Sequence, residues 1–129
     1  MSTHPLLSCN LKNGLTLLGW DQSKKITADR WTVCVRVEMT IPVEIKWFVN
    51  NPVDDEKFRR IRSELGESVV FQQKRERQFI RADQKGHLVK EICASVEETG
   101  MKYLGRDDFA AKTILKVFAD RQRRQARMT

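Results

Sequence analysis

Residues 31–49 read WTVCVRVEMTIPVEIKWFV, and this stretch decides the fold. Every odd-numbered position in it is apolar, whereas seven of the nine even-numbered positions are polar or proline. The side chains of a β-strand alternate between the two faces of a sheet. A period of two residues therefore predicts a strand with one face on a core and the other in water. We expect the odd-numbered side chains to be buried.

The stretch is too long for one straight strand. Nineteen extended residues would span about 60 Å, whereas a domain of this size has a radius of gyration of about 14 Å. Pro42 is the natural break, because proline lacks the N–H that a central strand needs. We predict a strand at 30–40, a kink at Pro42 and a second strand at 43–49 with the same face inward.

Two aromatic residues are candidates for contact with a partner. Phe48 breaks the polar pattern of the even-numbered positions, and Trp20 ends a short apolar segment at 15–20. Trp31 and Trp47 share the inward parity, so we expect them in the core. A large aromatic side chain on the outer face of a sheet marks a protein-binding surface. Trp20 and Phe48 are therefore the predicted partner-binding residues.

The remaining elements follow from turn and capping signals. Asn13-Gly14 predicts a turn, after which a strand at 15–20 pairs with the strand at 30–40 across a polar connection. Asn51-Pro52 is a favourable helix start, and Gly66 is a favourable stop. The other predicted elements are a helix at 52–65, a strand near 68–74, a helix from Asp83 to about Tyr103, and a last helix that starts at Asp107 or Asp108.

This order predicts a single α+β domain over residues 1–129. Its antiparallel sheet has three to four strands, and two to three helices pack on one face. We expect flexible ends at 1–8 and at 121–129, because the apolar pattern is missing from the first and basic residues dominate the second.

Composition excludes several classes of protein. The 129 residues are 40% apolar, which is enough for a core, but they contain no apolar run of about 20 residues that could span a membrane. The N-terminus has no features of a secretory signal. Cys9, Cys34 and Cys93 are an odd number at wide spacing, so they form neither a disulfide framework nor a zinc motif. We expect buried thiols in a protein of the cytoplasm.

No catalytic motif is present in the sequence. His4 and His87 have no cysteine at metal-ligand spacing, no serine sits in a nucleophile elbow, and the six glycines do not form a phosphate loop. We therefore predict no catalytic residue, no cofactor and no metal. An enzyme whose site is assembled from dispersed residues stays as a third hypothesis.

Basic charge supports the second hypothesis, a nucleic-acid-binding domain. The chain has 24 Lys and Arg against 17 Asp and Glu, a net charge of +7. The excess lies in residues 57–85 and 111–129, and arginine suits phosphate because its guanidinium donates two hydrogen bonds side by side. The predicted contact residues form two groups: Arg75, Arg77 and Arg81, and Arg121, Arg123 and Arg124.

The first hypothesis remains a non-enzymatic interaction domain. It binds another protein or a second copy of itself through aromatic residues of the sheet. The absence of catalytic motifs and the parity of Phe48 favour it over the other two.

Overall fold

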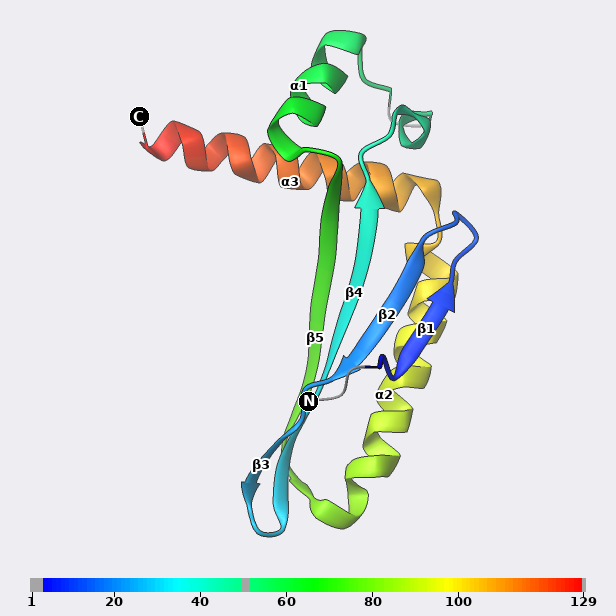
Figure 1. Ribbon diagram of the computed structural model, residues 1–129, viewed down its shortest axis with the longest axis vertical. Coiled ribbons are helices and arrows are strands. Elements are labelled where there is room, and N and C mark those ends of the chain that lie inside the picture. The colour runs from blue at the N-terminus through cyan, green and yellow to red at the C-terminus, as the bar shows by residue number, and fades with distance from the viewer. Residues whose placement is uncertain (1–3, 50–51, 129) are drawn as a thin grey trace.

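The helices of the protein pack against a five-stranded antiparallel sheet, as Figure 1 shows for the computed structural model. The structure describes residues 4–49 and 52–128. The strands are β1 (Leu7–Asn10), β2 (Thr16–Asp21), β3 (Lys24–Thr27), β4 (Arg30–Pro42) and β5 (Ser68–Arg81). The helices are α1 (Asp55–Leu65), α2 (Lys85–Thr99) and α3 (Asp107–Met128), with short helical turns η1 (Ile45–Phe48), η2 (Ala82–Gln84) and η3 (Gly100–Leu104). The predicted α+β class is confirmed.

The sheet is built around β4. One edge of β4 pairs with β5 along its whole length, from Arg30 opposite Arg81 to Pro42 opposite Ser68. The other edge is shared by β2 and β3, and β1 pairs with β2. The sheet therefore has more strands than the three to four predicted, because β3 lies in the expected connection and β1 includes Leu7 and Ser8 of the expected flexible end.

The parity prediction for β4 is confirmed. Its odd-numbered residues from Val33 to Ile41 are almost completely buried, and Val43 continues the row. In Figure 1 the strands pass in front of α2 and α3, so both helices cover the same face of the sheet. This helix-covered face contains the core, in which Ile92 of α2 and Ile114 of α3 pack with the odd-numbered row.

The strand predicted at 43–49 is wrong. β4 ends at Pro42, in agreement with the missing N–H of proline, and residues 45–48 form the turn η1. Trp47 and Phe48 are both buried, whereas neighbours in a strand point to opposite faces. The Trp47 indole donates a hydrogen bond of 2.8 Å to the Pro42 carbonyl, which holds the turn against the end of the strand.

The helix boundaries follow local chemistry. Asp54 caps α1, since its carboxylate accepts a hydrogen bond of 2.7 Å from the Lys57 N–H. The helix thus starts at Asp55, later than the predicted residue 52. At the far end of α2, Gly100 lies so close to Leu17 that a Cβ atom would be 2.8 Å from the Leu17 Cδ2 atom. A side chain at position 100 would therefore push into the core.

Two elements are longer than predicted. β5 continues through the charged residues after position 74 and reaches Arg81, with an irregular pairing near Phe79, whose φ is 57°. α3 extends to Met128, so the expected loose end at 121–129 is helical as far as the structure describes it. The C-terminal end of α3, red in Figure 1, projects beyond the edge of β5.

Candidate functional site: the helix-free face of the sheet

The second face of the sheet carries the even-numbered residues of β4. Arg36 lies in the middle of this helix-free face, with Trp20 of β2 on one side and Lys74 of β5 on the other. The next rung pairs Glu38 with Leu18 of β2, and these side chains also stay partly exposed. Strand register thus brings an aromatic ring and opposite charges together from three strands.

A hollow of about 580 Å³ lies on the helix-free face. Ligand pockets commonly enclose about 300–1,000 Å³, so its size is sufficient for a side chain or a small ligand. Its walls come from the ends of β2 and β3 and from the middle of β4 and β5. The lining residues are Trp20, Asp21, Gln22, Ser23, Lys24, Thr32, Cys34, Arg36, Lys74 and Glu76.

Trp20 and Arg36 form the wall of this hollow. The Arg36 guanidinium carbon is 5.9 Å from the centre of the Trp20 ring, which is within cation–π range, and Arg36 also pairs with Glu38. The Trp20 Nε1 and Arg36 Nε atoms are buried and have no acceptor among the described residues. A buried donor without a partner costs about 1–3 kcal/mol. This wall is therefore not optimised for stability.

Cys34 lies beside the hollow and is held as a thiol. Its backbone N–H donates a hydrogen bond of 3.0 Å to the Ser23 hydroxyl, and its side chain is opposite Glu76. Burial raises the pKa of the Cys34 thiol, and the nearby negative charge of Glu76 raises it further. Because the thiolate is the nucleophilic form, this environment makes Cys34 a weaker nucleophile than an exposed cysteine.

The charges around the hollow are balanced. Lys24, Arg36 and Lys74 stand against Asp21 and Glu76 at its rim, and Glu38 is paired with Arg36. A polyanion on this surface would meet as much negative as positive charge. The helix-free face is therefore electrostatically suited to another protein surface more than to phosphates.

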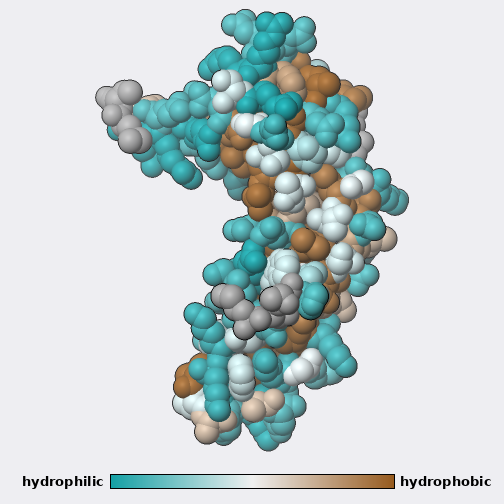
Figure 2. Space-filling model, viewed as in Figure 1, coloured by the Kyte–Doolittle hydropathy of each residue, from teal (hydrophilic) through white to brown (hydrophobic). Residues whose placement is uncertain are grey.

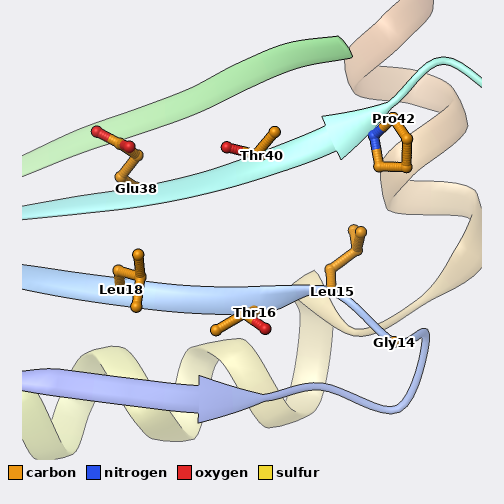
Figure 3. A pocket seen from close by; sticks show the side chains of 7 residues that line it. All are labelled: Gly14, Leu15, Thr16, Leu18, Glu38, Thr40 and Pro42. Atoms are coloured by element: carbon orange, nitrogen blue, oxygen red, sulfur yellow. The ribbon is translucent and has the colours of Figure 1, made fainter. Parts of the chain in front are cut away.

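A second hollow of about 360 Å³ extends this face toward the end of β4, where β2 and β4 diverge (Figure 3). Leu18 and Glu38 lie on one side of it, and Thr40 and Pro42 lie beside the end of the strand. The two hollows follow each other along the same two strands. The helix-free face is thus a continuous uneven surface and not an isolated pocket.

The structure separates the two predicted partner-binding residues. Trp20 is half-buried on the helix-free face, as expected. Phe48 is only 5% exposed and packs edge-on against Phe58 of α1, with the ring centres 6.0 Å apart. Because η1 replaces the expected strand, the parity argument that placed Phe48 on the outer face does not apply.

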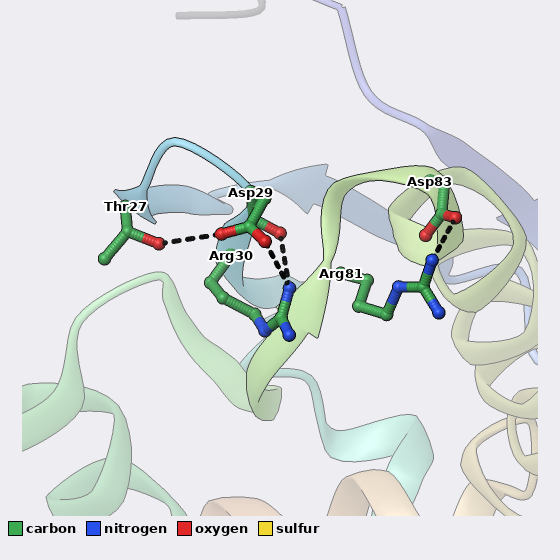
Figure 4. A network of polar contacts seen from close by, with 5 residues as sticks. All are labelled: Thr27, Asp29, Arg30, Arg81 and Asp83. Atoms are coloured by element: carbon green, nitrogen blue, oxygen red, sulfur yellow. Dashed lines mark hydrogen bonds and ion pairs between the residues drawn. The ribbon is translucent and has the colours of Figure 1, made fainter.

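The first group of predicted arginines lies along β5. Arg75 is half-buried and reaches Ser95 of α2 at 3.5 Å, and Arg77 is exposed. Arg81 forms an ion pair of 2.9 Å with Asp83, next to the pair formed by Arg30 and Asp29 (Figure 4). Arg81 is therefore already neutralised locally.

The second group lies on the last turns of α3. Arg121 donates to the Glu64 carbonyl of α1, and Arg123 pairs with Asp120. Arg124 is exposed. As far as the structure describes it, the predicted loose basic end is thus a helical surface that contacts α1.

Sequence reasoning missed most of the hollow. Arg36 and Lys74 become neighbours of Trp20 only through the register of three strands, and no pattern within one segment reveals it. The sequence signal available for Arg36 was its even-numbered position in the alternating stretch, since that position predicts a side chain on the outer face of the sheet, where Trp20 also lies.

Comparison with known proteins adds no assignment. No protein-family model matches the chain, and neither a curated protein nor a solved structure matches it. Within residues 4–49 and 52–128, no helix is long and apolar enough to cross a membrane. In the same part of the chain, no three His, Cys, Asp or Glu side chains gather as a metal site would require.

Proposed function

We propose that the protein is a non-enzymatic interaction domain that binds another protein on the helix-free face of its sheet. The observation that carries this proposal is the hollow beside Trp20 and Arg36 on a sheet face that no described helix covers. Tryptophan and arginine are the side chains that most often dominate the binding energy of protein interfaces.

The surroundings of Trp20 support a protein partner. Leu18 and Val70 contribute apolar area to the same face, and Val70 is 50% exposed. Charged side chains of both signs border this area. Interfaces between proteins commonly combine an apolar centre with a polar rim, and balanced charge provides specificity for the partner.

The chemistry of the hollow supports binding over catalysis. The Cys34 thiol is the strongest potential nucleophile in it, and its raised pKa keeps it protonated at neutral pH. The three cysteines are free, which supports our proposal that the protein works in the reducing cytoplasm.

Site-specific photo-crosslinking in cells of the source organism tests the proposal. A photoreactive residue replaces Gln72, which is exposed on the helix-free face opposite Glu38. We expect a discrete adduct after irradiation, and its mass separates a different protein from a second 15.1 kDa copy of the chain. The additional change Trp20→Ala should abolish the adduct.

A photoreactive residue at Ser63, exposed on α1, is the matched control and should not give this adduct. Equal labelling from Gln72 and Ser63 would contradict the proposal, as would a Gln72 adduct that persists in a folded Trp20→Ala variant.

A further inference from the structure

The positive charge of the protein is concentrated on two elements. β5 has four basic residues and one acidic residue, a net charge of +3, and residues 112–128 of α3 have six basic residues and one acidic residue, a net charge of +5. The whole chain carries +7. The other residues together are therefore close to neutral, and any electrostatic attraction of an anion must come from these two elements.

β5 and α3 border a concave surface. Figure 2 shows the outline of the molecule hollowed between the projecting end of α3 and the lower part of β5, with hydrophilic surface on both sides. Among the described residues, no strand pairs with the outer edge of β5. We call this concave surface the notch.

One side of α3 is turned toward β5. Phe109 packs edge-on against Phe71 of β5, with ring centres 5.4 Å apart. Lys116 and Arg127 follow Phe109 by seven and eighteen residues, which places them on the same side of the helix, and Arg124 lies next to them. From Lys116 to Arg127 this stripe is about 17 Å long, equal to roughly five steps of one nucleic-acid strand.

The cations of the notch are available for a ligand. Seven basic side chains of β5 and α3 have no carboxylate oxygen within ion-pair distance in the part of the chain that the structure describes. Of these, Lys74 lines the hollow of the helix-free face and Arg121 donates to the Glu64 carbonyl, which leaves Arg75, Arg77, Lys116, Arg124 and Arg127 for the notch. The Nε atom of Arg75 is buried without an acceptor. A half-buried guanidinium without a counter-charge is unfavourable, and a bound phosphate would relieve it.

We infer that the notch binds nucleic acid through its phosphate backbone. Among the ten basic residues of β5 and residues 112–128, seven are arginines, which bind phosphate in a bidentate manner. The surface is concave and so suits a strand or the ridge of a duplex better than a flat membrane. No acidic side chain interrupts the stripe except Asp120, which Arg123 neutralises.

Fluorescence anisotropy with labelled 20-nucleotide single-stranded RNA, single-stranded DNA and duplex DNA tests the inference. Binding at 50 mM KCl should weaken steeply with salt, and five phosphate contacts give a slope of about −3.5 for a single strand and about −4.5 for a duplex in a plot of log affinity against log salt. The triple variant Lys116→Gln, Arg124→Gln, Arg127→Gln should bind about tenfold more weakly or worse and lose about two to three units of that slope.

The matched control removes three exposed lysines elsewhere, Lys25→Gln, Lys57→Gln and Lys90→Gln, and should retain binding within about twofold. Both variants change only exposed side chains, and unchanged circular dichroism melting verifies their folds. Absence of binding at 50 mM KCl would overturn the inference, and so would equal losses in the two variants. Tighter binding of poly-glutamate or of phosphatidylserine vesicles than of all three nucleic acids would overturn it in favour of an acidic protein or a membrane.

Discussion

The two faces of β4 receive alternate side chains of one strand and have opposite properties. On the helix-covered face, Val35 and Ile41 are fully buried and belong to the same core as residues of helices from distant parts of the chain. On the helix-free face, Arg36 and Glu38 remain partly exposed and lie beside buried donors that lack acceptors.

This difference separates stability from recognition. A well-packed, apolar row supplies most of the free energy of folding, whereas a row with unsatisfied donors and balanced charge contributes little to it. The strand is therefore stabilised mainly from one side, and its other side is the surface on which we propose that a partner binds. Four experiments measure how far this separation holds.

The largest effect is expected on the covered face. Ile41→Ala removes buried methyl groups from a residue with no exposed surface, so the free energy of unfolding should fall by about 2–5 kcal/mol. The adjacent substitution Thr40→Ala, on the helix-free face, should change it by less than about 0.5 kcal/mol. Urea denaturation measures the free energy of unfolding of both variants. Similar losses of this free energy in the two variants would contradict the difference between the faces.

A tight contact behind the covered face gives the next effect. In Gly100→Ala the new methyl group would be 2.8 Å from Leu17, which is fully buried, so overpacking should destabilise the protein by about 1–3 kcal/mol. Gly86→Ala is the control, because α2 leaves open space around Gly86, and it should raise stability by up to about 1 kcal/mol. Thermal melting should shift in opposite directions in the two variants.

A smaller effect is expected at Trp20 on the helix-free face. Trp20→Phe keeps an aromatic ring but removes the indole N–H that has no acceptor. Stability should stay within about 1 kcal/mol of the parent protein or rise, while the photo-crosslinked adduct weakens. A marked loss of stability, measured by urea denaturation, would show that Trp20 is primarily structural.

The smallest effect concerns the buried thiols at alkaline pH. Burial raises the pKa of Cys34 in the folded protein above the ordinary value of 9.0, so the folded state binds this proton more tightly than the unfolded state. The resulting stability is complete below pH 9 and is lost as the pH rises through the folded pKa. Relative to Cys34→Ala, the parent protein should therefore lose stability as the pH rises above 9 in urea titrations, and a constant difference would contradict the assignment.

Sequence predicted the part of the fold that depends on long, regular patterns. The odd-numbered row of β4 needs only a count of period two, and Gly66 ends α1 as its local chemistry predicted. The predicted start at residue 52 was too early, because Asp54 is the residue that caps the helix. The period of two failed after Pro42, because only a few residues remained and a short turn could bury Trp47 and Phe48 together.

The remaining elements depend on contacts between distant segments. The charged residues after position 74 form a strand because β4 supplies hydrogen bonds along one edge. They contain no apolar pattern from which the sequence alone would predict this strand. β1 and β3 have four residues each, which is too few for periodicity to be visible. The last turns of α3 are tied to α1 by Arg121 and the Glu64 carbonyl, a contact that joins residues 57 positions apart.

The pairing of β4 with β5 also determines an order of folding. Pro42 and Ser68 are separated by 26 residues and enclose α1, whereas Arg30 and Arg81 are separated by 51 residues at the other end of the same ladder. Closing the shorter loop loses less chain entropy, and a helix formed early within it shortens the distance further. The ladder should therefore close first beside α1 and lengthen from there, so slowing of α1 formation would delay the pairing of β5 with β4.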